Sequence, residues 1–153
     1  MTAPGSITYL AFWTRYVREV ALRHPEWRGI GQPTDRNYLE ERAGLRNCLI
    51  GPAFKRDGFL GYELVIRSRD AEANHKAFMA LWERREAVER TYGRPLVFDP
   101  RHGAKRRLVG EYRLGSLDLP GADVDEYIDW FIDCGERLRR VIERYGDVIT
   151  SYV

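Results

Sequence analysis

Cysteine is scarce in this chain of 153 residues, and long apolar runs are missing. The two cysteines, Cys48 and Cys134, lie far apart in the sequence, so a dense disulfide framework is excluded and two free thiols in a reducing compartment are expected. No segment approaches the roughly 20 apolar residues of a membrane-spanning helix. The apolar residues near the N-terminus are interrupted by Arg15 and Arg18, which argues against a signal peptide. We therefore expect a cytoplasmic protein that does not contact a membrane.

The chain also has little excess charge. Its net charge is only +2, although 31% of its residues are charged. A dedicated nucleic-acid-binding domain usually has a basic surface, so a function of this kind must depend on a local cluster. The hydrophobic share of 44% is ordinary for a folded protein. A chain of this length can bury its own core without disulfides or metals, and we expect one domain over residues 1–153.

Catalytic and metal-binding motifs are absent as well. A restriction-type nuclease needs an acidic residue two positions before a lysine, and none of Lys55, Lys76 and Lys105 has one. The cysteines and histidines are single and scattered, so no metal site is expected. The sequence contains no phosphate-binding glycine-rich loop and no dinucleotide fingerprint. It therefore favours a non-catalytic protein without a cofactor over an enzyme, while a nuclease with a differently built active site stays open.

Three segments have the apolar spacing of amphipathic helices. In each, apolar residues recur every three or four positions, and a serine or aspartate precedes the first turn, where its side chain can accept hydrogen bonds from free main-chain N–H groups. Gly93, followed by Pro95, predicts the end of the second helix. The expected helices cover residues 6–22, residues 70–92 and the segment from residue 123 onward, with Ser6, Asp70 and Asp123 as caps.

Other segments alternate between apolar and polar residues, as strands do. A Gly-Pro pair and an Asp-Gly pair predict a turn at residues 51–58, and residues 37–42 suit either a short strand or a helical turn. The expected fold is α+β: a single, mostly antiparallel β-sheet packed against three helices, in the order helix, strands, helix, strands, helix. The expected strands cover residues 45–50, 59–66, 96–98 and 106–114.

Several of these patterns, taken together over nearly the whole chain, resemble a bacterial family named domain of unknown function 4268. The resemblance implies the α+β fold. Members are often attached to a restriction-endonuclease-like nuclease domain, so it also implies a role in DNA processing or defence. No such nuclease domain occurs in this sequence, and we expect a free subunit or a stand-alone binder. The similar features are the Phe12-Trp13 pair, the strand at residues 61–66, the helix around residues 75–78 and 86–89, and the last helix with Tyr127 and Trp130.

A cationic loop is the main positive signal for binding. Residues 101–107 contain four basic side chains besides His102, and two more arginines follow the strand at residues 59–66. Cations in such a cluster can follow a phosphate backbone. We expect DNA or RNA as the partner, or assistance to a nuclease subunit. The candidate binding residues are Arg67, Arg69, Arg101, Lys105, Arg106 and Arg107.

Two tryptophans support an alternative function. Trp27 lies in a loop, and Trp130 lies off the main apolar stripe of its helix. Exposed aromatic residues are common anchors of interfaces, and many proteins form homodimers. The alternative is therefore a protein-interaction or homodimerisation module that uses Trp27 and Trp130.

Overall fold

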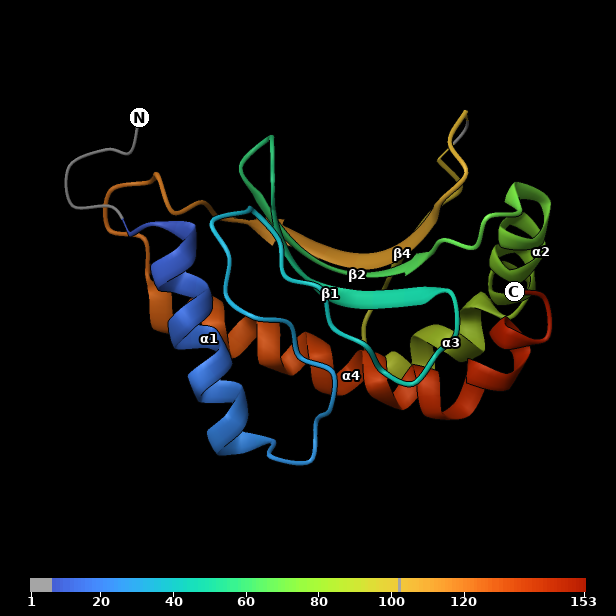
Figure 1. Cartoon of the computed structure of the whole chain (residues 1–153). Coiled ribbons are helices and arrows are strands. Elements are labelled where there is room, and N and C mark those ends of the chain that lie inside the picture. Colours follow the sequence, from blue (N-terminus) through green and yellow to red (C-terminus); the bar gives the residue numbers. More distant parts are fainter. Residues whose placement is uncertain (1–6, 102) are drawn as a thin grey trace.

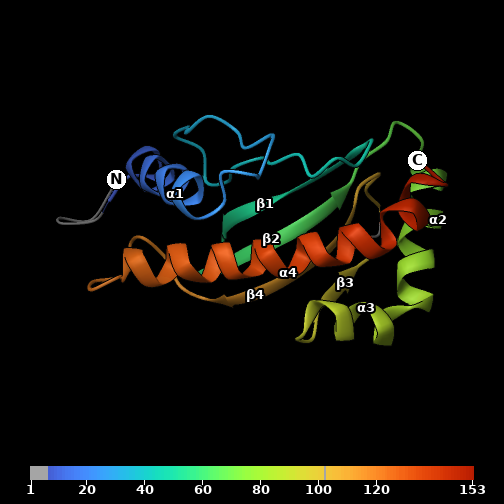
Figure 2. The same ribbon diagram turned by 90° about the horizontal axis from the view of Figure 1, so that it is seen from below.

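A four-stranded antiparallel sheet with helices beneath it forms the frame of the chain in a computed structural model that describes residues 7–101 and 103–153 (Figure 1). The strand order is β1-β2-β4-β3. The longest helix, α4, runs under the strands (Figure 2). In chain order the elements are α1 (Tyr9–Arg23), β1 (Cys48–Lys55), β2 (Phe59–Ile66), α2 (Ala71–Glu83), α3 (Arg85–Tyr92), β3 (Val97–Asp99), β4 (Arg107–Leu114) and α4 (Val124–Thr150).

The helix ends follow the local signals of the sequence at most positions. Asp70 and Asp123 cap α2 and α4 by accepting main-chain N–H groups of the first turn, as predicted. Gly93 ends α3 in the left-handed conformation with φ of 96°. The first helix differs, because its cap is Thr8, whose hydroxyl oxygen accepts the N–H of Ala11 at 3.1 Å. The predicted cap, Ser6, lies outside the described residues.

The helix predicted at residues 70–92 is two helices, α2 and α3, so the prediction of three helices and its element order were wrong. The break lies at Arg84, whose main-chain N–H bonds to the carbonyl of Leu81, three residues back. The Arg84 side chain donates to the Ala80 carbonyl that the helix leaves free. Residues 83–86 are all charged, so no apolar side chain holds this turn against the core. The two helices point in different directions (Figure 2).

The first strand lies further along the chain than predicted. β1 continues to Lys55, so the predicted turn at residues 51–58 shrinks to residues 56–58. Pro52 is compatible with the strand because its carbonyl accepts the N–H of Leu39 at 3.0 Å, and its nitrogen therefore faces the same edge, away from β2. Its missing N–H removes no hydrogen bond between β1 and β2.

Residues 37–42, which the sequence left open, run along the outer edge of β1. The N–H of Glu41 donates to the Ile50 carbonyl at 2.8 Å, and the Ile50 N–H donates back at 3.0 Å. These contacts are isolated bridges and not a regular strand. The segment nevertheless covers the sheet edge that β1 would otherwise expose.

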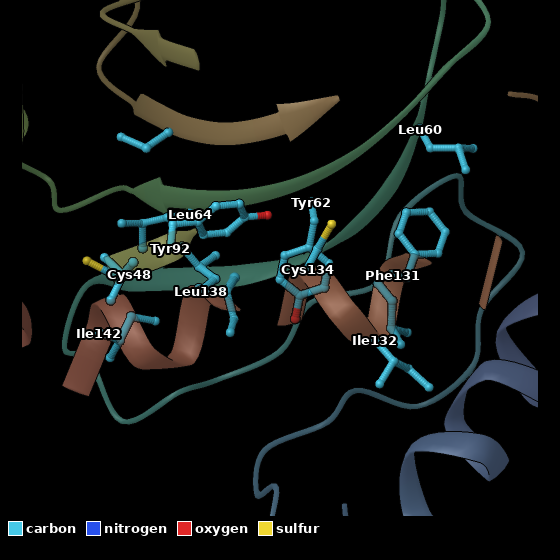
Figure 3. Close-up of a cluster of buried hydrophobic side chains, with 14 of the residues drawn as sticks. Cys48, Leu60, Tyr62, Leu64, Tyr92, Phe131, Ile132, Cys134, Leu138 and Ile142 are labelled. Atoms are coloured by element: carbon cyan, nitrogen blue, oxygen red, sulfur yellow. The ribbon is translucent and has the colours of Figure 1, made fainter. Parts of the chain in front are cut away.

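The core fills the space between the sheet and α4, with further contacts from α1, α2 and α3 (Figure 3). The alternation predicted for β2 is confirmed: its inward side chains are all fully buried, while its outward ones face the opposite side of the sheet. Leu138 and Ile142 of α4 point toward them in Figure 3. The inward residues of β2 are Leu60, Tyr62, Leu64 and Ile66.

A buried ion pair fixes α4 to the segment along β1. The Glu41 side chain, 0% exposed, accepts hydrogen bonds from the hydroxyls of Tyr16 (2.9 Å) and Tyr62 (3.2 Å). Arg139 Nη2 lies 3.2 Å from its other oxygen. Burial raises the pKa of Glu41, while Arg139 and the two hydroxyls oppose that rise. The Arg139 guanidinium also covers the ring of Trp27 at 3.6 Å.

The outer face of the sheet is concave and faces away from the described helices (Figure 1). It is bounded at one end by the turn at residues 56–58 and at the other by residues 103–106, which precede β4. We call this surface the trough. The side chains on the trough side of the strands include Leu49, Ala53, Glu63, Val65, Leu108 and Tyr112.

Among the described residues, none of the helices combines the length and the apolar character needed to cross a membrane.

Candidate nucleic-acid interface

The register of the sheet brings basic residues that flank three strands to one end of the trough. Cys48 pairs with Ile66, and Ile66 pairs with Arg107, so the start of β1, the end of β2 and the start of β4 are aligned. Basic residues that flank these positions in the sequence must therefore lie close together. The main-chain N–H of Arg67 also donates to the Asn47 carbonyl at 2.9 Å, which joins the segment before β1 to the end of β2.

These residues surround a pocket of about 660 Å³, which we call the basic pocket. Of the described residues that line it, six are arginine or lysine and none is acidic. Such an arrangement provides donors and positive charge for several phosphate groups at once. The basic residues are Arg42, Arg46, Arg67, Arg69, Lys105 and Arg106.

A buried amide holds the two predicted basic segments together. Asn74, in the first turns of α2, is 0% exposed. Its Nδ2 donates to the carbonyls of Ser68 (3.0 Å) and Lys105 (3.1 Å), and its Oδ1 accepts the N–H of Ser68 at 2.9 Å. Asn74 therefore fixes the distance between the end of β2 and the loop before β4, and with it the shape of the basic pocket.

Few acidic side chains contact the cations of the basic pocket within the described residues. Arg67 lies 3.7 Å from the exposed carboxylate of Glu40, a long and solvated contact. Arg46 donates to the main-chain oxygen of Val153. In the part of the chain that the structure describes, Arg69 and Arg106 make no ion pair and are exposed. Local clustering thus supplies the positive charge that the net charge of +2 does not indicate.

The structure brings four of the six predicted binding residues into this pocket: Arg67, Arg69, Lys105 and Arg106. Arg101 lies further along, at the rim of a second pocket in the trough. Arg107 is placed differently, because its Nη1 folds back onto the carbonyls of its own loop, with Ala104 at 2.6 Å. Arg107 therefore shapes the loop instead of lining the pocket. Sequence reasoning missed Arg42, Arg46 and Asn74.

The second pocket, of about 240 Å³, lies in the middle of the trough and shares Arg67 and Arg106 with the basic pocket. We call it the middle pocket. The Glu63 carboxylate lies at one end of it, only 7% exposed, with Lys55 Nζ at 3.2 Å from both oxygens and the Tyr112 hydroxyl bonded to one. Burial and the Glu63 charge raise the pKa of Tyr112, which keeps its hydroxyl protonated as the donor. The apolar residues in its lining include Leu39, Leu49, Ala53, Val65 and Leu108.

The predicted tryptophan anchors are both partly buried. Trp27 lies between the Arg139 guanidinium and the ring of His24, which stacks on it at 4.1 Å between centroids. Trp130 packs against Phe131 at 5.5 Å. Both rings thus contribute to packing inside the chain, and an interface built on them stays a prediction.

The other polar clusters hold elements together. Glu111 Oε1 accepts the hydroxyl of Tyr92 at 2.7 Å and Arg94 Nη2 at 2.9 Å, which ties β4 to the end of α3. Burial raises the pKa of Cys134, beside this cluster, and of Cys48 to about 12, so neither thiol is a ready nucleophile. Within the described residues, no group of three or more histidine, cysteine or acidic side chains is placed to hold a metal ion.

Comparison with known proteins gives one family. The model of a family described as a domain of unknown function (DUF4268) matches residues 8–146. No curated protein and no solved structure matches the chain.

Proposed function

Because the chain belongs to the DUF4268 family, whose description names no activity, we propose its function from its surface chemistry: it binds nucleic acid through the basic pocket and the trough. One observation carries the proposal. Six basic side chains from three segments surround one pocket, and no acidic residue is found in its lining over residues 7–101 and 103–153. A repeating phosphate backbone is the common biological ligand that offers several negative charges to such a site.

The arrangement around the basic pocket supports binding more than it supports catalysis. In the described part of the chain no carboxylate side chain lines the basic pocket, so it offers no acidic ligand for the metal ion that most nucleases use. The Asn74 amide donates hydrogen bonds to both basic segments and fixes their positions, a role that suits a preformed anion site. The protein therefore acts as a binding component. Assistance to a nuclease or defence complex stays a prediction from the family resemblance.

The test is a binding titration of labelled DNA and RNA at several salt concentrations. Arg69 and Arg106 are changed together to Ala, because both side chains are exposed and make no ion pair within the described residues. We expect weaker binding and a log–log salt dependence that is shallower by about 1 to 2, since each lost phosphate contact removes roughly 0.7–0.9 from the slope. The stability of the double variant, measured by thermal unfolding, should equal that of the unmodified protein.

A matched control separates local charge from net charge. Arg90 of α3 and Arg140 of α4 are exposed arginines on the helical side of the sheet, and neither makes an ion pair within the described residues. Changing both to Ala removes the same charge and should leave binding within about twofold of the unmodified protein. Absence of binding by the unmodified protein at low salt, or equal losses in both double variants, would refute the proposal.

A further inference from the structure

The middle pocket differs in chemistry from the basic pocket beside it. Its floor contains the aliphatic side chains of Leu49, Val65 and Leu108, which form one row across β1, β2 and β4. Leu49 and Leu108 are 8% and 6% exposed even though they lie on the face without helices. A solvated sheet face normally carries polar side chains at such positions. The row therefore forms an apolar floor within a charged trough, and half-buried Val65 is its most exposed member.

Polar groups surround this apolar floor on both sides. Arg67 and Arg106 stand at the border with the basic pocket, and Tyr38 stands on the side of the outer edge segment. Lys55 and Glu63 lie at the opposite end. A flat heteroaromatic ring could thus contact the aliphatic floor, while guanidinium planes stack on it and polar groups meet its edge.

The two pockets are joined through shared residues. Leu49, Arg67 and Arg106 line both of them, so a ligand can occupy the two pockets at once. A nucleotide has the matching division, with a phosphate on one side and a planar, partly apolar base on the other. In a duplex the bases are stacked and paired, so only an unpaired base can enter a pocket of this kind.

We propose that the middle pocket binds one unpaired base of a single-stranded nucleic acid, while the basic pocket holds the adjoining phosphates. The inference rests on the proposed function, because the basic pocket supplies most of the affinity. It adds a preference that phosphate contacts alone cannot produce: the strand must present a free base. The base is recognised by contact and stacking, and we expect little dependence on its identity.

The experiment compares three ligands of equal length for the full chain: oligothymidylate, an abasic deoxyribose-phosphate oligomer and a DNA duplex. Oligothymidylate should bind about tenfold or more tightly than the abasic oligomer, which has the same phosphates without bases. Val65→Trp fills the floor of the middle pocket and should weaken binding of oligothymidylate about tenfold, with little effect on the abasic oligomer. Val65→Gln, a smaller change, should act in the same direction if the tryptophan variant does not fold.

Leu22→Trp is the control, because Leu22 is 73% exposed on α1, remote from the trough, and the change adds the same side chain. It should leave all three affinities unchanged. Equal affinity for the abasic oligomer and oligothymidylate, or equal losses for both in Val65→Trp, would overturn the base pocket while leaving phosphate binding intact. Thymidine monophosphate that binds as tightly as the oligomer would assign the pocket to a free nucleotide and overturn the strand proposal. If none of the three ligands binds, the proposed function itself fails.

Discussion

Replacement of Arg139 by Met should destabilise the protein more than any other single change to the buried network. Glu41 is 0% exposed, and Arg139 is its only cationic partner among the described residues, at 3.2 Å. Methionine keeps a long apolar side chain against the ring of Trp27 but removes the charge. The carboxylate is then left with two hydroxyl donors and no compensating charge, inside a packed core.

The magnitude follows from what remains buried in each variant. Removal of one partner of a buried ion pair costs about 3–5 kcal/mol. Glu41→Gln should cost less, about 1–2 kcal/mol, because the amide oxygen still accepts a tyrosine hydroxyl and Arg139, whose side chain is 17% exposed, keeps some contact with water. The double variant should be more stable than Arg139→Met alone, since it has no buried charge left to compensate.

The pH dependence provides the sharper test. Burial raises the pKa of Glu41 and Arg139 opposes this, so loss of Arg139 raises the folded-state pKa further. A folded-state pKa above the unfolded value, about 4.3 for Glu, means that protonation favours the folded state. The cost of Arg139→Met should therefore be full at neutral pH and shrink as the pH falls toward about 5. Urea unfolding, monitored by circular dichroism at several pH values, measures both the cost of the substitution and its dependence on pH. A cost below about 1 kcal/mol, or a cost independent of pH, would refute this account of the pair.

Two further predictions concern the site and the loop beside α4. Asn74→Ala should cost about 1–3 kcal/mol in thermal or urea unfolding and should also weaken nucleic-acid binding without any change of charge, because the carbonyls of Ser68 and Lys105 lose their shared donor; unchanged affinity would show that the amide does not position the pocket. For His24, burial lowers the pKa, but hydrogen bonds with Glu26 and Glu136 outweigh it and the net shift is upward. The stability that these bonds provide is then complete below a pH of about 6.5 and is lost as the pH rises through the higher folded-state pKa. The free energy of unfolding of the unmodified protein should therefore decrease over that pH range, whereas that of His24→Gln should stay constant.

Local signals in the sequence predicted the elements that depend on local physics. Asp70 and Asp123 cap helices because a cap needs only the next three residues, and the alternation of β2 follows from one buried face. The breaks that depend on distant partners were missed. Arg84 divides a continuous helical pattern because no apolar residue holds that turn to the core. Pro52 fits in a strand because its nitrogen faces the Leu39 segment, although the residue itself is in register with Tyr62 of β2.

The candidate site was predictable where charge alone marks it. Four of its cations were identified because they cluster in the sequence, two just after β2 and two just before β4. Arg42 and Arg46 were missed because their proximity depends on the register of β1 against β2, which the sequence analysis did not predict, and the strand expected at residues 45–50 begins at Cys48 and continues to Lys55. Asn74 was missed for another reason. A polar residue in the first turns of a helix normally faces water, and only the tertiary fold shows that it is fully buried against two loops.

Glycines on the trough side of the strands make room for two larger neighbours, Tyr112 and Glu63. A side chain at Gly61 would collide with the ring of Tyr112, since an added Cβ would lie 2.7 Å from it. At Gly110 an added Cβ would lie 3.1 Å from the Glu63 side chain. Both glycines therefore let larger neighbours lie flat on the sheet, although glycine in a strand interior costs stability. Tyr112 and Glu63 are bonded to each other at one end of the trough, and half-buried Val65 lies between them and the basic pocket, where an unpaired base would have to bind.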